Sequence, residues 1–252
     1  MIIGARGLSS FYHILYIDVS DTLRPPGLDI LVLLLAILGA ILVSIQPVTS
    51  PLIASRMVLD PTLLALALFL AIRSSAGLAT LIQTGVINVY LSYPLSKATI
   101  ALVLLISRVL IPSLLILAVP LATSIILLGP TMYKGLDVIL SSYASFLLQS
   151  LLYGSLFILI AVRVRSQASS GILSVAVYFT YIALNLILSG IGSAIGNEIL
   201  RKVGDSMFLP EIVYHAYTSG DYDIWQLALV PTLATTAMIA YLVYFSRRFE
   251  VA

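Results

Sequence analysis

The chain contains no cysteine, only two histidines and few charged residues for its length. Charged residues make up 10% of the 252 positions, hydrophobic residues make up 60%, and the mean hydropathy is +1.11. An ordinary soluble domain carries roughly 25% charged residues, so this chain has too few to cover a water-facing surface. The lack of cysteine excludes a disulfide framework and any metal site built on thiolates. We therefore predict an integral membrane protein whose outside is largely in contact with lipid.

The residues that most catalytic chemistry needs are also missing from the hydrophobic stretches. His13 and His215 both fall outside those stretches, so neither can activate a serine or hold a metal within the membrane. No lysine follows a glycine anywhere in the chain, which excludes the Gly-Lys-[Ser/Thr] sequence of a phosphate-binding P-loop. No basic stripe indicates contact with nucleic acid. We expect no enzymatic activity, no metal, no cofactor bound by this chain and no nucleic-acid partner.

Six hydrophobic stretches are long enough to cross a membrane as helices, because a span needs about 20 apolar residues. The six predicted spans are 28–46, 61–82, 98–128, 137–162, 170–190 and 224–246. The second is predicted to begin at Asp60-Pro61, where aspartate caps the helix and proline takes its first position. The third exceeds the membrane thickness, so its first turns stand outside the membrane or the helix breaks at Pro112 or Pro120. We predict an all-α, polytopic fold that forms a single transmembrane domain over residues 1–252.

Residues 8–19, before the first span, show an amphipathic pattern that is too polar to cross a membrane. Apolar residues recur there at helical spacing: Leu8, Phe11, Tyr12, Leu15, Tyr16 and Val19. The pattern assigns Asp18 to the opposite, polar face. We predict an interfacial helix with its tyrosines at headgroup depth; the alternative is an amphipathic helix packed against the bundle.

The distribution of basic residues predicts how the chain crosses the membrane. With the N-terminus inside, seven basic residues fall on the inner side: Arg6, Arg24, Lys97, Arg163, Arg165, Arg247 and Arg248. Four fall on the outer side: Arg56, Lys134, Arg201 and Lys202. Because cytoplasmic loops carry an excess of lysine and arginine, we predict a multi-pass protein of the cell membrane with both termini in the cytoplasm.

A few polar residues lie within the predicted spans, and their roles stay open. Arg73 is costly at the bilayer centre, so it either faces a path or a subunit interface, or lies nearer the cytoplasm than the span suggests. Arg108 is expected to extend its charged end to the membrane surface. Gln149 and Asn185 either form interhelical hydrogen bonds or face a path through the membrane.

Three glycines, Gly190, Gly192 and Gly196, lie where the fifth span ends. The spacing of Gly192 and Gly196 suits close helix packing or a re-entrant turn, but glycines also mark the end of a helix. The sequence does not decide between these interpretations, although Gly190 fits the helix end better.

The connection between the second and third spans is the most distinctive part of the sequence. Residues 83–97 read QTGVINVYLSYPLSK: a glycine, a short apolar segment, a Leu-Ser-x-Pro turn and a basic residue. This stretch resembles the cytoplasmic segment of type-2 ABC transporter permeases, the exporter class with six spans in each half. The acidic residue that is common before the glycine in that family is replaced here by Gln83 and Thr84. The layout also resembles that family, with an amphipathic helix before the first span and a long outer connection, 191–223, that forms short helices.

The resemblance implies a permease subunit of an ATP-driven exporter. It implies pairing with a second permease subunit, identical or different, and separate ABC ATPase subunits that hold ATP and Mg. The residues expected to contact the ATPase are Gly85, Val86, Ile87, Val89, Tyr90, Leu91, Pro94, Lys97, Arg163 and Arg165. Candidates for the substrate path or the seam between permeases are Arg73, Gln149 and Asn185.

Apolar side chains that project into the cytoplasm make sense if a partner buries them. The alternative for residues 83–97 is a place among the lipid headgroups. Two other functions also stay open for the whole chain. One is a secondary transporter or channel that works without ATP, and the other is a membrane-embedded assembly subunit.

Overall fold

The computed structural model describes residues 5–24, 27–45, 50–133, 135–220 and 222–249, and every regular element among them is a helix. The α-helices that form the six spans and the helix before them are α1 (Ala5–Thr22), α2 (Gly27–Ile45), α3 (Pro51–Phe69), α4 (Gly77–Gln83), α6 (Lys97–Leu105), α7 (Ile111–Leu128), α9 (Leu136–Val164), α10 (Gln167–Ala194) and α13 (Ile224–Arg248). Short helices connect them: α5 (Ile87–Leu91), α8 (Pro130–Tyr133), α11 (Glu198–Ser206) and α12 (Leu209–Thr218). Two π-helical segments, η1 (Leu70–Ala76) and η2 (Ile106–Leu110), join α3 to α4 and α6 to α7.

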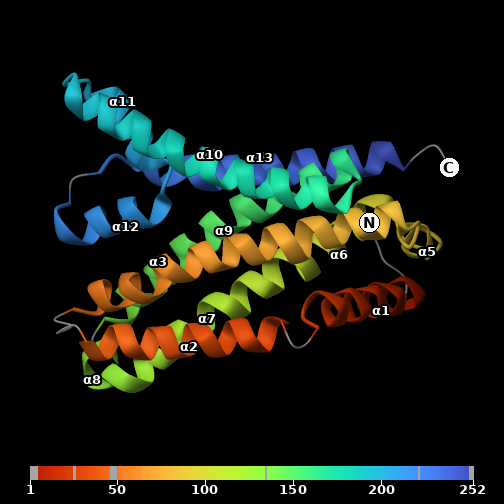
Figure 1. Ribbon diagram of the computed structural model, residues 1–252, viewed down its shortest axis with the longest axis horizontal. Coiled ribbons are helices and arrows are strands. Elements are labelled where there is room, and N and C mark those ends of the chain that lie inside the picture. The colour runs from red at the N-terminus through yellow and green to blue at the C-terminus, as the bar shows by residue number, and fades with distance from the viewer. Residues whose placement is uncertain (1–4, 25–26, 46–49, 134, 221, 250–252) are drawn as a thin grey trace.

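Six continuous helices in the described part of the chain are long and apolar enough to cross a membrane. They run side by side as one elongated bundle (Figure 1). α5, the start of α1 and the end of α13 lie at one end, here called the inner end, whereas α8 and α12 lie at the opposite, outer end. The predicted all-α, six-span architecture is confirmed.

Five of the six spans begin and end within a few residues of their predicted bounds, and the second does not. Its helix begins at Pro51, where the Ser50 hydroxyl accepts a hydrogen bond from the Ile53 amide at 3.3 Å. The prediction that Asp60 caps this helix is wrong, because Asp60 and Pro61 both lie inside it. Arg56 and Asp60 lower the local hydropathy, and the first turns of the helix were therefore not predicted. In the structure the two side chains lie 3.6 Å apart on one face of the helix.

The length of α2 matches the thickness of a membrane. α2 has 19 residues and is therefore about 28 Å long, close to the hydrocarbon thickness of about 30 Å. Its first residue, Gly27, is level with Arg73, since a Cβ atom on Gly27 would lie 3.0 Å from Nη2 of Arg73. If α2 spans the hydrocarbon, the guanidinium of Arg73 lies at one membrane boundary, and α1, α4, α5 and α6 stand beyond that boundary (Figure 1). The third span is one continuous helix from Lys97 to Leu128, so it does not break at Pro112 or Pro120. That its first turns stand outside the membrane stays a prediction.

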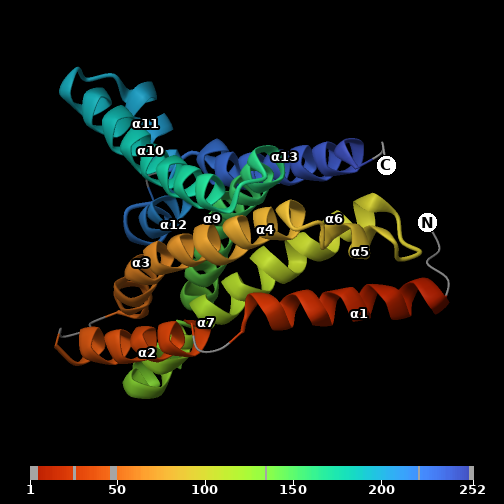
Figure 2. The same ribbon diagram turned by 45° about the vertical axis from the view of Figure 1, so that its right-hand side comes forward.

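α1 packs along α6 and η2 and runs obliquely to α2, as comparison of Figures 1 and 2 shows. Its buried stripe is formed by Ile14, Asp18 and Thr22, which follow one another at helical spacing. Tyr12 and Tyr16, which were assigned to the apolar face, are 63% and 73% exposed. The assignment of Asp18 to the outward face is wrong, because its side chain is fully buried. This arrangement matches the alternative of packing on the bundle, and headgroup depth for the tyrosines stays a prediction.

The outer connection folds back as a helical hairpin. α11 packs antiparallel against the end of α10, and both helices extend past the rest of the bundle (Figure 2). Gly192 packs so closely that a Cβ atom there would lie 2.3 Å from the Arg201 amide nitrogen. Gly196, with φ of 69°, ends α10, whereas Gly190 has nothing near its Cβ position. Gly192 therefore serves close helix packing, and Gly196 serves helix termination.

Candidate functional site

The segment between the second and third spans forms the tip of the inner end. α4 ends at Gln83, and Gly85 then takes a φ of 77°, a conformation that glycine adopts without strain. The short helix α5 follows, and Ser96 caps α6 by accepting a hydrogen bond from the Thr99 amide at 3.1 Å. A glycine turn and a serine cap therefore define the two ends of the segment and hold α5 across the tops of two spans.

The two faces of α5 have different environments. Ile87 and Tyr90 are buried in the core formed by α1, α4, α6, α9 and α13. Val86 and Val89 on the other face are 40% and 58% exposed. Of these apolar residues, Ile87 and Tyr90 are already buried within the chain and anchor the helix. Val86 and Val89 are exposed and remain available to a partner.

The remaining residues predicted for this surface also lie at the inner end. Leu91 is half-buried and Pro94 is exposed. The ammonium group of Lys97 donates a hydrogen bond to the carbonyl oxygen of Phe249 at the end of α13. Arg163 and Arg165 are exposed, and Arg165 ends α9 with a φ of 61°. Neither arginine has a carboxylate within 4.0 Å in the part of the chain that the structure describes.

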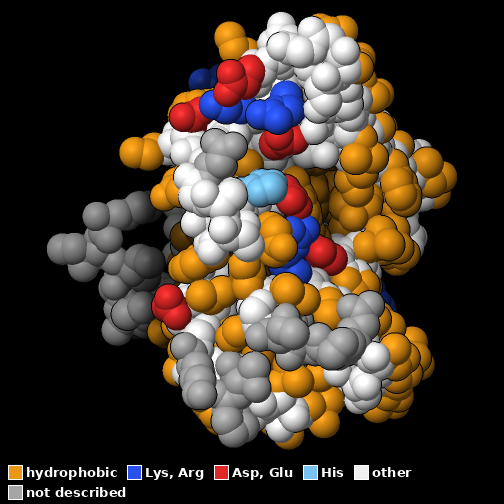
Figure 3. Space-filling view, turned by 90° about the vertical axis from the view of Figure 1, so that its left-hand side faces the viewer, with side chains coloured by type: hydrophobic (Ala, Val, Ile, Leu, Met, Phe, Trp, Pro, Cys, Tyr) orange, Lys and Arg blue, Asp and Glu red, His pale blue; other side chains and the backbone are white. Residues whose placement is uncertain are grey.

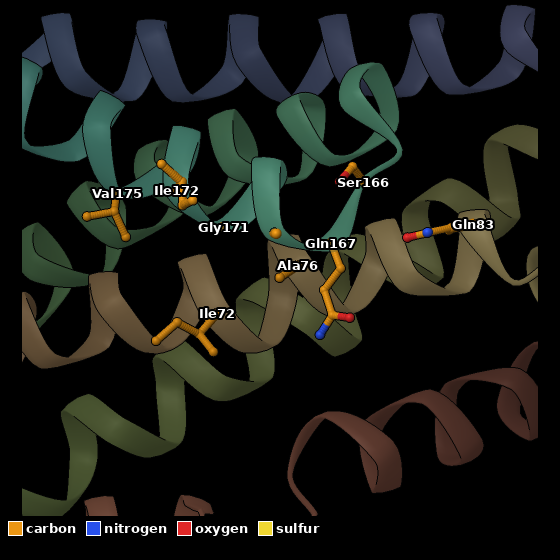
Figure 4. A pocket seen from close by; sticks show the side chains of 9 residues that line it. Ile72, Ala76, Gln83, Ser166, Gln167, Gly171, Ile172 and Val175 are labelled. Carbon is orange, nitrogen blue, oxygen red and sulfur yellow. The ribbon is translucent and has the colours of Figure 1, made fainter.

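An open groove of about 670 Å³ lies between the end of α4 and the start of α10. Gln83 lies on one wall, and Ser166 and Gln167 lie on the other (Figure 4). Its floor continues toward the membrane between Ala76 of η1 and Gly171 of α10. The structure thus brings Gln83 and residues 166–168, which lie far apart in the sequence, to the same groove.

A buried ion pair between α1 and η2 lies beneath α5. Nη2 of Arg108 lies 2.6 Å from Oδ1 of Asp18, and the two side chains are 1% and 0% exposed. The Ser107 hydroxyl donates to the second carboxylate oxygen of Asp18. The expectation that Arg108 extends to the membrane surface is wrong, because an acidic residue from α1 reaches it inside the protein. Paired and hydrogen-bonded charges of this kind are tolerated in a low-dielectric interior, whereas single charges are not.

This ion pair connects both π-helical segments with α5. The Ser74 hydroxyl in η1 donates to the carbonyl oxygen of Arg108 in η2. Gly77 leaves the space for the guanidinium, since a Cβ atom there would lie 2.8 Å from Nη1 of Arg108. Tyr90 of α5 lies beside Asp18; burial raises the pKa of Tyr90 to about 12, and the Asp18 carboxylate acts in the same direction. π-Helical segments are frequent at functional sites, and here two of them adjoin one buried charge pair.

Arg73 lies on η1 and is half-buried. No carboxylate of the described residues lies within ion-pair distance of its guanidinium, which is near Gly27 at the start of α2. Whether Arg73 lies near the membrane surface or faces a path or a subunit interface stays a prediction.

Gln149 and Asn185 both bind the outer connection. Oε1 of the fully buried Gln149 accepts a hydrogen bond from the Leu209 amide at 3.1 Å. Nδ2 of Asn185 donates to the carbonyl oxygen of Gly204 at 2.9 Å. Both amides therefore make the interhelical hydrogen bonds that the sequence analysis considered. A role for Arg73, Gln149 or Asn185 in a path or a seam stays a prediction.

The sequence patterns did not predict the buried role of Asp18, its contact with Tyr90 or the hydrogen bonds of serines within the spans. Ser75 is an example, since its hydroxyl lies 2.7 Å from that of Ser170 and 2.8 Å from that of Ser174.

Comparison with family models finds none that matches the chain, and comparison with curated proteins likewise finds no match.

Proposed function

We propose that this chain is the permease subunit of an ATP-driven exporter of the type-2 ABC class, located in the cell membrane with both termini in the cytoplasm. It shares the substrate path with a second permease subunit, and separate ATPase subunits bind ATP and Mg. The observation that carries the proposal is the construction of α5. The buried face of α5 is anchored in the core by Ile87 and Tyr90, while Val86 and Val89 remain exposed at the tip of the bundle.

Rigid anchoring suits a segment that transmits force. A helix held across two spans moves with them, so a closing ATPase that grips Val86 and Val89 can shift both spans together. Below α5, the Asp18–Arg108 pair continues the connection to η1 and η2. The exposed Arg163 and Arg165 at the end of α9 supply charge for acidic residues of a partner.

Pairing with a second permease is supported by the uneven burial of the spans. α2 and α10 are the least buried of the six spans, and α10 exposes large apolar side chains along its length, such as Ile172, Phe179 and Leu186. Such faces are stable only against lipid or another membrane protein. We propose that the second permease subunit packs against the exposed face of α2 or of α10.

The proposal is tested by placing a charge on the exposed face of α5. We expect Val89→Glu to abolish co-purification of a soluble protein that carries a P-loop, and to abolish ATP-dependent export. The buried Ile87 and Tyr90 are left unchanged, so the fold should be retained, as measured by gel filtration and thermal unfolding. Ile199→Glu is the matched control, because Ile199 is 76% exposed on α11 at the outer end.

Loss of the P-loop protein with Val89→Glu but not with Ile199→Glu supports docking at α5. Retention of the P-loop protein and of export in the Val89→Glu variant contradicts it. Transport that persists in cells without the ATPase favours the secondary transporter. A complex without any transport favours the assembly subunit.

A further inference from the structure

An aromatic pocket of about 250 Å³ lies in the outer half of the bundle, far from α5. α3, α9 and α10 form its walls, and Phe208, just before α12, covers one side. Figure 3 looks onto the outer end of the protein, where a histidine, basic side chains and acidic side chains border a hollow. The pocket lies within a single chain, so it needs no second subunit to be complete.

Three tyrosines provide most of the aromatic surface of this pocket. The ring of Tyr153 lies edge to face against Tyr178 and Tyr181, with centroids 5.1 Å and 5.4 Å apart. The Tyr181 hydroxyl donates to the carbonyl oxygen of Met207, which fixes that ring against the outer connection. Rings held at right angles to one another present faces and edges in several directions, as in the aromatic cages that recognise ammonium groups.

The carboxylate of Asp60 also lines the pocket and is incompletely paired. Its Oδ1 atom is buried and has no hydrogen-bond partner among the described residues. Oδ2 lies 3.6 Å from Nε of Arg56, but that guanidinium donates instead to Glu211 at 2.8 Å. Arg56 also stacks over the Tyr214 ring, with 4.6 Å from its central carbon to the ring centroid. The strongest interactions of Arg56 therefore point away from Asp60.

The carboxylate oxygen of Asp60 that lacks a partner favours a positive ligand. The charged groups that line the pocket are the guanidinium of Arg56 and the carboxylate of Asp60, whose side chain is 41% exposed. Glu211 and Tyr214 hold the guanidinium, whereas Oδ1 of Asp60 has no hydrogen-bond partner among the described residues. A cation seated among the tyrosines gains both an ion pair with Asp60 and attraction to the ring faces. A neutral ligand would gain neither of these interactions.

We propose that this pocket binds a small organic cation, with its ammonium group between Asp60 and the rings of Tyr153, Tyr178 and Tyr181. The volume suits a compact alkylammonium group and excludes a drug-sized molecule. The ammonium group can come from a soluble amine or from a lipid headgroup. The site does not depend on the proposed function, because it lies in one chain and at the opposite end from α5.

The test uses the full-length protein in nanodiscs of phosphatidylglycerol, with choline as the probe and isothermal titration calorimetry as the readout. Its uncharged counterpart of the same shape, 3,3-dimethylbutan-1-ol, is titrated in parallel. We expect choline to bind at least about tenfold more tightly than the alcohol, because only choline pairs with the carboxylate. Equal binding of the two, or binding of neither, overturns the proposal without any variant that could misfold.

Variants then locate the site. Asp60→Asn should weaken choline binding by about tenfold or more, because it removes the negative charge and keeps the size of the side chain. Glu198→Gln removes an acidic charge from α11 outside the pocket and should have no effect. Unchanged binding by folded Asp60→Asn, or equal losses in Asp60→Asn and Glu198→Gln, overturns the assignment.

A final comparison identifies the source of the ammonium group. If headgroups occupy the pocket, nanodiscs of phosphatidylcholine should reduce the apparent affinity for free choline several-fold relative to phosphatidylglycerol. Equal affinity in the two lipids indicates a soluble amine. Either result supports an ammonium site, provided that the choline preference over the alcohol is present.

Discussion

Asp18 and Arg108 show how a single pair of residues determines where a helix docks. The two side chains are almost completely buried, and removing one partner leaves an uncompensated charge in the interior. We expect Asp18→Asn to lower the free energy of unfolding by about 3–5 kcal/mol. Thermal or denaturant unfolding of the purified protein measures the loss, and limited proteolysis near α1 should report its release.

The matched control is Asp21→Asn. Asp21 lies 3.5 Å from the same guanidinium but its side chain is 56% exposed, so water replaces the contact and the cost should stay below about 1 kcal/mol. The double variant Asp18→Leu with Arg108→Met should recover most of the stability, because apolar residues of similar size replace the pair. An Asp18→Asn protein as stable as Asp21→Asn would show that the pair is not what holds α1.

At the scale of helices, the α10–α11 hairpin depends on two glycines that face the opposite backbone. A Cβ atom on Gly204 would lie 2.4 Å from the Ser189 amide nitrogen, and one on Gly192 would lie 2.3 Å from that of Arg201. We expect Gly192→Ala to separate the two helices and to lower the free energy of unfolding by about 1–3 kcal/mol. Gly190→Ala is the control on the same helix, since its Cβ meets nothing within 4 Å and alanine favours the helix. Equal unfolding midpoints for the two variants would contradict close packing at Gly192.

Hydropathy and helical periodicity predicted the six spans because lipid exposure leaves a continuous apolar signal. They failed where the deciding contact lies far along the chain. Arg56 interrupts the second span in sequence, but Glu211 and Asp60 compensate its charge in space. Asp18 pairs with a residue 90 positions away, a distance that no local pattern reports. The spacing of Ile14 and Asp18 was a weak cue, since both fall on the stripe that the structure buries.

For the whole molecule, the helices extend unequally past the membrane. If α2 spans the hydrocarbon, then Ser92 at the inner tip and Thr218 on α12 lie in water on opposite sides, and Leu33 lies in lipid. Because the chain has no cysteine, single cysteines at these three exposed positions can be labelled without background. We expect a membrane-impermeant maleimide to label Thr218→Cys in intact cells and Ser92→Cys only after permeabilisation. Leu33→Cys should react only after denaturation.

The orientation that this experiment measures decides whether an ATPase can reach α5 at all. The inner end carries Lys97, Arg163 and Arg165, and a basic excess of this kind marks the cytoplasmic side. Labelling of Ser92→Cys in intact cells would place α5 outside the cell, where ATP is scarce, and would exclude the docking of a cytoplasmic motor. It would also turn the aromatic pocket toward the cytoplasm. The two proposals can therefore be tested separately. The reversed orientation would exclude the ATPase but would leave the ammonium site, which would then face the cytoplasm.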